Sequence, residues 1–153
     1  MSNLTAAQQN ILKEAEAIYA SLFNSIEGSI FDAPERAINL FRPRLAAEER
    51  EHFDVLFLTN KNSMIAVERL FSGTINQTSV YPREIVKRAL ELNAAAIILA
   101  HNHPSGNPEI SRSDIAITKQ IKSAAELIDV RVLDHIIITA GGGSVSLVQA
   151  GHV

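Results

Sequence analysis

The sequence predicts a mixed α/β fold in which helices flank a central mixed sheet. Segments with apolar residues at helical spacing alternate with apolar runs of strand length. The run at 94–100, AAAIILA, is uninterrupted, which is typical of a strand buried on both faces. With 153 residues and 46% hydrophobic content, the chain can bury one good core but is too short for two typical enzyme domains.

The first predicted helix runs from Thr5 to about Ser25. Thr5 and Gln8 have the spacing of a capping box, and helical spacing of apolar residues follows at Ile11, Leu12, Ala15, Ile18, Tyr19, Leu22 and Phe23. Residues 25–29, around Gly28, form the predicted hinge. We therefore divide the chain into an N-terminal amphipathic helix with its hinge, 1–28, and a main domain, 29–153.

The apolar stripe of this helix needs a partner. It packs either on the surface of its own domain or on a second copy of the chain, which would make a homodimer. Lys13 is the only basic residue of the helix, which argues against a role at a membrane surface.

The main domain begins with a predicted short helix and a hairpin. The helix opens at 32–34, with Asp32 near the cap position and Pro34 in the first turn. A strand from Phe53, a turn at 59–62 and a strand over 64–71 then form the hairpin.

Two more helices and two more strands follow the hairpin, besides the apolar run described above. Pro82 begins a helix that extends to about Leu92, and a second helix covers 114–128. Two strands, 131–139 and 145–148, are joined by the glycine triplet 141–143. No helix and no lysine-serine pair follow the triplet, so it predicts a hairpin turn rather than a phosphate-binding loop.

The segment HNHPSGNPEISRSD, residues 101–114, carries the clearest chemical signal. Residues two apart in a strand point the same way, so His101 and His103 can present their imidazoles to one point. The loop after Pro104 is rich in turn residues and can bring Asp114 back to the histidines. Imidazole nitrogen and carboxylate oxygen suit zinc, and three protein ligands leave one position open, as in catalytic sites. We predict one Zn²⁺ per chain on His101, His103 and Asp114.

Ser111 and Asp114 also have an ordinary structural interpretation. Ser111 can be a helix N-cap, and Asp114 a first-turn carboxylate that the helix dipole favours. Ser111 can serve both purposes at once.

These residues bring out a family resemblance. The pattern H-x-H, seven residues, S, two residues, D resembles the JAMM signature of the JAB1/MPN metalloprotease superfamily, and His101, His103, Ser111 and Asp114 all match it. HNHPSG, together with LDHIII at 133–138, looks like the RadC branch of bacterial JAB-domain proteins. The resemblance covers about residues 32–150 and implies a JAB/MPN (cytidine-deaminase-like) fold.

The resemblance also implies the remaining catalytic residues. A glutamate from an earlier part of the fold acts as general base, and Glu51, just before a hydrophobic strand, matches the family pattern. Glu68 is the second candidate. Ser111 would donate a hydrogen bond to the oxyanion that forms during attack on a carbonyl. His135 lies within an apolar strand, so we interpret it as a core or supporting residue and not as a ligand.

The predicted function is therefore that of a zinc metallopeptidase acting on the amide bond of a protein or peptide, with an isopeptide bond as one option. Two other functions stay open. One is a DNA-binding or DNA-processing accessory protein, although the helix-hairpin-helix region usual in RadC proteins has no counterpart in this sequence. The other is a zinc-binding scaffold without turnover.

Composition sets the expected surroundings. The net charge is −3 with scattered basic residues, which makes nucleic acid an unlikely partner. The chain has no cysteine, no signal-peptide pattern and no membrane-spanning stretch, so we expect a cytoplasmic protein without disulfides.

Overall fold

The fold is described from a computed structural model, which covers residues 4–25, 30–76 and 79–153. These ranges contain the helices α1 (Ala6–Ser25), α2 (Pro34–Leu45), α3 (Pro82–Glu91) and α4 (Arg112–Glu126). The strands are β1 (His52–Leu58), β2 (Met64–Ser72), β3 (Ala96–His103), β4 (Arg131–Thr139) and β5 (Ser144–Ser146). The predicted mixed α/β class is confirmed.

The strands form one mixed sheet in the order β2-β1-β3-β4-β5. β3 and β4 are parallel, while the other neighbouring pairs are antiparallel. The parallel pair is connected through α4, as a crossover between parallel strands requires. The hairpin of β1 and β2 and the glycine turn between β4 and β5 both agree with the prediction, and Thr139 donates its backbone N–H to the carbonyl of Gly143 over 2.9 Å.

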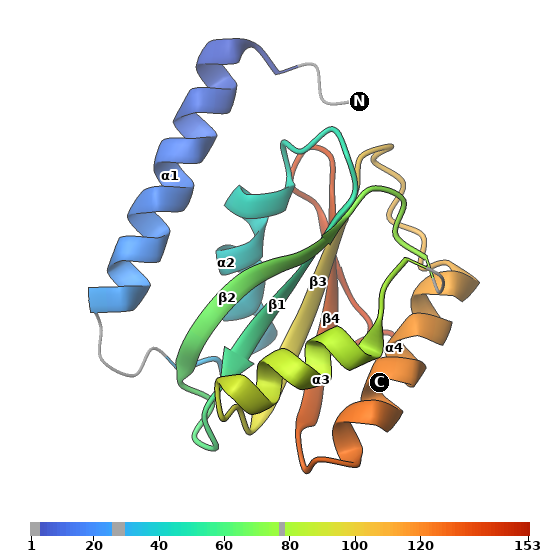
Figure 1. The fold of residues 1–153 in the computed structure, drawn as a ribbon. Coiled ribbons are helices and arrows are strands. Elements are labelled where there is room, and N and C mark those ends of the chain that lie inside the picture. The colour runs from blue at the N-terminus through green and yellow to red at the C-terminus, as the bar shows by residue number, and fades with distance from the viewer. Residues whose placement is uncertain (1–3, 26–29, 77–78) are drawn as a thin grey trace.

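Helices cover both faces of the sheet (Figure 1). Side chains of α3 and α4, including Ile85 and Ile117, pack with Phe53 and Leu99 on one face. Phe41 and Leu45 of α2 pack with sheet residues of the other face. β1 and β3 are apolar on both faces because each lies between two helical layers.

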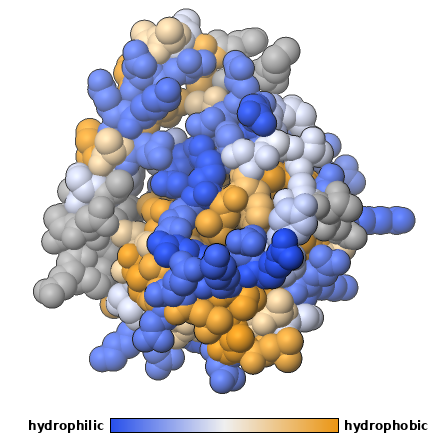
Figure 2. Space-filling model, in the orientation of Figure 1, coloured by the Kyte–Doolittle hydropathy of each residue, from blue (hydrophilic) through white to orange (hydrophobic). Residues whose placement is uncertain are grey.

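α1 lies beside α2 on the outside of the molecule (Figure 1). The predicted capping box is present: Thr5 donates its N–H to Gln8 Oε1, and Gln8 donates its N–H to Thr5 Oγ1. Leu12 is half-buried, whereas Ile11 and Ile18 stay 62% and 58% exposed. Figure 2 shows mostly hydrophilic side chains on the visible surface of α1, with isolated apolar ones between them. The homodimer remains a prediction.

Several predicted boundaries need correction. β3 continues through His103, because its pairing with β4 extends to Thr139 beyond the apolar run. The N-cap of α2 is Ala33 rather than Asp32, with Pro34 as the first helical residue. β5 covers Ser144–Ser146 rather than 145–148. α4 begins at Arg112 with Ser111 as its N-cap, in agreement with the predicted cap. Most of the predicted hinge, residues 26–29, and the side chains of Leu22 and Phe23 lie outside the described part of the chain.

None of the helices in the described ranges has the length and apolar character needed to cross a membrane.

Candidate metal centre

Two histidines meet at the end of β3. His101 and His103 are two residues apart in the strand and therefore point to the same face of the sheet. Their Nε2 atoms lie 3.0 Å apart. His101 is buried and its ring stacks on that of Phe53 with an interplanar angle of 8°, whereas His103 lies nearer the surface.

The carboxylate of Asp114 reaches the same point from the first turn of α4. Ser111 is the N-cap residue, and it forms a capping box with Asp114. Asp114 donates its N–H to Ser111 Oγ over 3.0 Å, and its Oδ2 accepts the N–H of Ser111 over 2.9 Å. Its Oδ1 lies 3.1 Å from His101 Nε2, and Oδ2 lies 3.4 Å from His103 Nε2. The capping box thus fixes the carboxylate that faces the histidines.

Hydrogen bonds on the other ring nitrogens orient both imidazoles. His103 Nδ1 lies 2.8 Å from the carbonyl oxygen of Asn107, which can only accept, so Nδ1 carries the proton. In a neutral ring, Nε2 is then left with a lone pair. His103 therefore presents an unprotonated nitrogen to Asp114 and His101.

A longer chain of hydrogen bonds orients His101. Thr118 donates its only hydroxyl hydrogen to the carbonyl of Asp114 over 2.6 Å, so it must accept from His135 Nδ1, also at 2.6 Å. His135 is fully buried, and burial lowers its pKa well below the ordinary value. A neutral His135 with its proton on Nδ1 accepts at Nε2 from His101 Nδ1, 2.7 Å away. In a neutral His101 ring, Nε2 is then also left with a lone pair.

This arrangement attracts positive charge. Hydrogen bonding to Asp114 raises the pKa of His103. Burial alone would raise the pKa of Asp114, but hydrogen bonds from His101 and His103 in their protonated forms bring it well below the ordinary range. Two lone pairs and a carboxylate face one another, and a cation among them removes their mutual repulsion.

A metal ion fits this set of donors. One donor atom from each of His101, His103 and Asp114 can be chosen so that all three lie within 4.8 Å of one another. Two imidazoles and a carboxylate, with no thiolate in a chain that lacks cysteine, match the ligands of hydrolytic zinc sites. The metal-binding potential of the three predicted residues is therefore seen in the structure, while the identity of the metal stays a prediction.

The candidate ligands open into a pocket of about 490 Å³. Its other lining residues come from three separate segments, and they are Glu51, Ile75, Ser105, Asn107, Glu109, Ser111 and Arg112. The loop after β3 and the described part of the loop after β2 thus form its walls. Ser111 accepts from Asp114 N–H through its hydroxyl oxygen, and the hydroxyl hydrogen can still be donated toward the pocket.

The two glutamates considered as general base lie in different surroundings. Glu51 lines the pocket together with the candidate ligands, and its Oε2 accepts the N–H of Ile75 over 2.6 Å. Glu68 lies on β2 and forms hydrogen bonds of 2.8 Å with Nε and Nη2 of Arg88. The geometry therefore favours Glu51.

Three polar residues around the cluster were not singled out in the sequence: Thr118, Asn107 and Asn102. Thr118 orients His135, and Asn107 orients His103. Asn102 lies between the two histidines, yet nothing in its local pattern indicates its contacts with residues about 50 positions earlier. His135 contacts His101 without joining the candidate ligands, in agreement with its interpretation as a supporting residue.

Comparison with known proteins matches residues 31–152 to a family described as RadC-like JAB domain. A UPF0758 protein of Methylibium petroleiphilum is 53% identical over 122 residues, which is 80% of this chain and 54% of that protein. A UPF0758 protein of Vibrio cholerae is 44% identical over 146 residues, 95% of this chain and 90% of the relative. A third, from Verminephrobacter eiseniae, is 50% identical over 82% of this chain and 52% of its own length. The chain thus spans about half the length of two of these relatives.

Proposed function

Because the chain belongs to the RadC-like JAB domain family, we propose that it is a zinc-dependent metallopeptidase that hydrolyses an amide bond. The five-stranded mixed sheet with its helices agrees with the JAB/MPN fold that the resemblance implies. Membership of this family is consistent with metallohydrolase activity. The choice of a peptide bond as the target is our proposal.

One observation carries this proposal. Glu51 lines the same pocket as His101, His103 and Asp114, although it lies 50 positions before the nearest of them. A hydrolase of this kind needs a carboxylate beside the metal ligands, and the sheet brings one there.

His101, His103 and Asp114 would hold the zinc through Nε2, Nε2 and a carboxylate oxygen. When bound, zinc supplies Lewis acidity and makes a water molecule more acidic. The hydrogen bonds that His103 Nδ1 donates to the carbonyl of Asn107 and that His101 Nδ1 donates to His135 Nε2 leave the two Nε2 atoms unprotonated in neutral rings and aim them at the metal position.

Glu51 would move the proton. Its Oε2 is held by the N–H of Ile75, and its carboxylate faces the pocket in which the substrate would lie. From there it can accept a proton from the attacking water and deliver it to the leaving amine. Ser111 would donate its remaining hydroxyl hydrogen to the developing oxyanion of the substrate carbonyl. Its role in the helix cap fixes the oxygen from which that hydrogen bond is made.

The substrate would be a protein or peptide. The pocket is open rather than enclosed by long insertions, and its walls come from the short loops after β2 and β3. An isopeptide bond, in which a lysine amine is the leaving group, uses the same chemistry. We also propose a cytoplasmic location, since a chain without cysteine suits a reducing compartment.

Glu51→Gln tests the proposal. Zinc-loaded wild type is screened against a library of fluorogenic peptides and isopeptides, and Glu51→Gln is compared with it on every cleaved substrate. We expect the variant to keep its zinc and to lose about 100- to 10,000-fold in turnover, the usual contribution of a general base.

Glu68→Gln is the matched control, because it makes the same chemical change at a glutamate that pairs with Arg88. It should retain activity. Unchanged turnover in Glu51→Gln would assign the base elsewhere. A zinc-loaded wild type that cleaves no member of the library would support the alternative of a metal-binding scaffold.

A further inference from the structure

The residue between the two histidines, Asn102, is almost completely buried at 1% exposure. Side chains alternate along β3, so Asn102 points away from the face that carries His101 and His103. Its side chain nevertheless reaches the backbone of the segment that precedes β1.

The register of the sheet explains this reach. Antiparallel pairing of β1 with β3 places Phe53 opposite His101. Continued by two residues, the same register places His52 opposite Asn102 and Glu51 opposite His103. The Asn102 side chain makes hydrogen bonds to His52, the first residue of β1, and to Arg50 of the segment before it, just beyond the Phe53–His101 pair.

Its two shortest hydrogen bonds are made to the peptide groups on either side of Glu51, and a third, of 3.4 Å, joins Nδ2 to the carbonyl of Glu48. Asn102 Oδ1 accepts the N–H of His52 over 2.7 Å, and Nδ2 donates to the carbonyl of Arg50 over 2.8 Å. That N–H belongs to the peptide after Glu51, and that carbonyl belongs to the peptide before it. One amide side chain therefore fixes the backbone on both sides of the candidate base. An amide side chain supplies both the donor and the acceptor that this requires.

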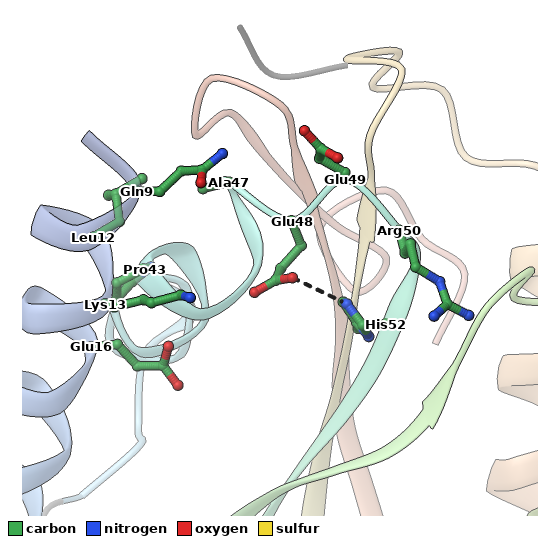
Figure 3. A pocket seen from close by; sticks show the side chains of 10 residues that line it. All are labelled: Gln9, Leu12, Lys13, Glu16, Pro43, Ala47, Glu48, Glu49, Arg50 and His52. Atoms are coloured by element: carbon green, nitrogen blue, oxygen red, sulfur yellow. Dashed lines mark hydrogen bonds and ion pairs between the residues drawn. The ribbon is translucent and has the colours of Figure 1, made fainter. Parts of the chain in front are cut away.

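The opposite side of this segment is open. A pocket of about 390 Å³ lies between α1 and residues 47–52. Figure 3 shows its lining side chains, and the dashed line joins Glu48 to His52, whose contact is 3.2 Å long. Glu49 and Arg50 are exposed there. The segment is thus not enclosed by packed side chains, and its position depends strongly on hydrogen bonds such as those of Asn102.

We propose that Asn102 is a positioning residue that holds Glu51 at the metal centre, so that the strand carrying two ligands also places the general base. This inference rests on the proposed function, in which Glu51 is that base. Asn102 itself does not contact the substrate; it acts through the two peptide groups beside Glu51.

The N–H of Ile75 reports the position of Glu51 directly, because it donates to Glu51 Oε2 over 2.6 Å. The first experiment follows the Ile75 amide by ¹H–¹⁵N NMR in the metal-free protein. Asn102→Ala should move this signal toward its position in Glu51→Ala, where the acceptor is missing. An Ile75 signal that stays at its wild-type position would overturn the proposal.

A double-variant comparison separates a positioning role from general loosening. If Asn102 acts through Glu51, adding Asn102→Ala to Glu51→Ala leaves the Ile75 signal unchanged. An equal displacement in both backgrounds would refute the proposal.

Ser72→Ala is the control, since it removes the 2.7 Å contact of Ser72 with His52 without touching either peptide group of Glu51. Asn102→Asp, which keeps the shape and the acceptor, gives a second variant if the alanine variant does not fold; it should displace Ile75 by less than Glu51→Ala does.

Cobalt(II) is the probe that connects this result to the metal centre. All variants should bind one cobalt, and Asn102→Ala should change the pH dependence of the visible cobalt spectrum in the same direction as Glu51→Gln. Loss of cobalt from a folded Asn102→Ala would show that Asn102 supports the ligands instead, and would overturn the proposal. If the pH dependence of the cobalt spectrum is the same in Glu51→Gln and in the wild type, this counts against Glu51 as the base. The Ile75 signal would still decide whether Asn102 holds Glu51.

Discussion

His101 Nδ1 and His135 Nε2 lie 2.7 Å apart, and the hydroxyl of Thr118 on the far side of His135 decides which of the two nitrogens carries the proton. His101 Nδ1 donates to His135 Nε2, and His135 Nδ1 donates to the hydroxyl oxygen of Thr118. These two hydrogen bonds leave His101 with a lone pair on the nitrogen that faces Asp114.

Thr118→Val should therefore weaken metal binding without removing a ligand. Without the hydroxyl, His135 can place its proton on Nε2 and donate to His101, which forces the His101 proton onto the nitrogen that must bind the metal. Loss of a supporting hydrogen bond of this kind costs about 10- to 100-fold in metal affinity. Competition with a chromophoric zinc chelator measures the effect.

Thr118→Ser keeps the hydroxyl and is the matched control, with an affinity close to that of the wild type. Equal zinc affinity in Thr118→Val and wild type would show that metal binding does not depend on which ring nitrogens of His101 and His135 carry the protons.

Metal content gives the most direct test of the ligand set. Wild type should carry one zinc per chain after dialysis against metal-free buffer, and His103→Ala should lose it, because two remaining ligands cannot hold the ion. Elemental mass spectrometry on untagged protein provides the count. His152→Ala removes an exposed histidine far from the ligands in sequence and should change nothing. Zinc that persists in His103→Ala would place the metal elsewhere.

Stability should depend on pH in opposite ways with and without metal. In the metal-free protein the pKa of His103 is raised, so its stabilising contribution is present below the unfolded pKa of about 6.5 and is lost as the pH rises through the folded value. The pKa of Asp114 is lowered, so its contribution is present above about 3.9 and is lost only in stronger acid. The His103–Asp114 pair therefore stabilises the metal-free fold most between these limits.

Zinc reverses the trend at His103, because the metal competes with the proton for the same nitrogen. The increase in melting temperature on adding zinc should grow as the pH rises from 5 to 8, and thermal unfolding in both states measures it. A zinc-induced increase that is constant over this range would contradict the site.

The structure also predicts a residue that matters for stability alone. Asp54 of β1 is fully buried and lies 2.8 Å from Arg44 Nε of α2 and 2.9 Å from Arg69 Nε of β2. Asp54→Asn leaves both guanidinium groups without their shared charge and should cost about 3 kcal/mol in the free energy of unfolding. Urea unfolding measures this cost. Asp32→Asn, at an exposed pair with Arg36, should have no measurable effect, and equal costs at the two positions would contradict the argument.

Local sequence patterns were sufficient for most elements and for the cluster of His101, His103 and Asp114. Helix α1, the hairpin and the two histidines follow from periodicity and spacing, which depend on neighbouring residues only. The end of β3 could not be predicted in this way, because His101, Asn102 and His103 are polar, and their place in the strand depends on pairing with β4 and, at His101, also with β1. The N-cap of α2 was misassigned because proline after Ala33 sets the helix start without a side-chain cap.

His135 was interpreted as a core or supporting residue, but its contacts and the other supporting residues could not be predicted, for a different reason. Thr118 and His135 come from separate elements, and their contact exists only after α4 has packed on the sheet. Asn102 contacts the backbone carbonyl of Arg50, 52 positions earlier. Every residue has such a carbonyl, so the residue type at position 50 does not indicate the contact. Contacts of this kind follow from the strand register rather than from residue type.

The pairing of Phe53 with His101 constrains how this protein can change during evolution. Side chains alternate between the two faces of a sheet, so one residue inserted between Glu51 and Phe53 would turn the carboxylate away from the histidines while leaving the apolar core of β1 intact. Such a chain would fold and keep the cluster of His101, His103 and Asp114, but it would lack the proposed general base. Residues 51–53 should therefore tolerate neither insertion nor deletion among active descendants, even though the preceding segment lies at the surface.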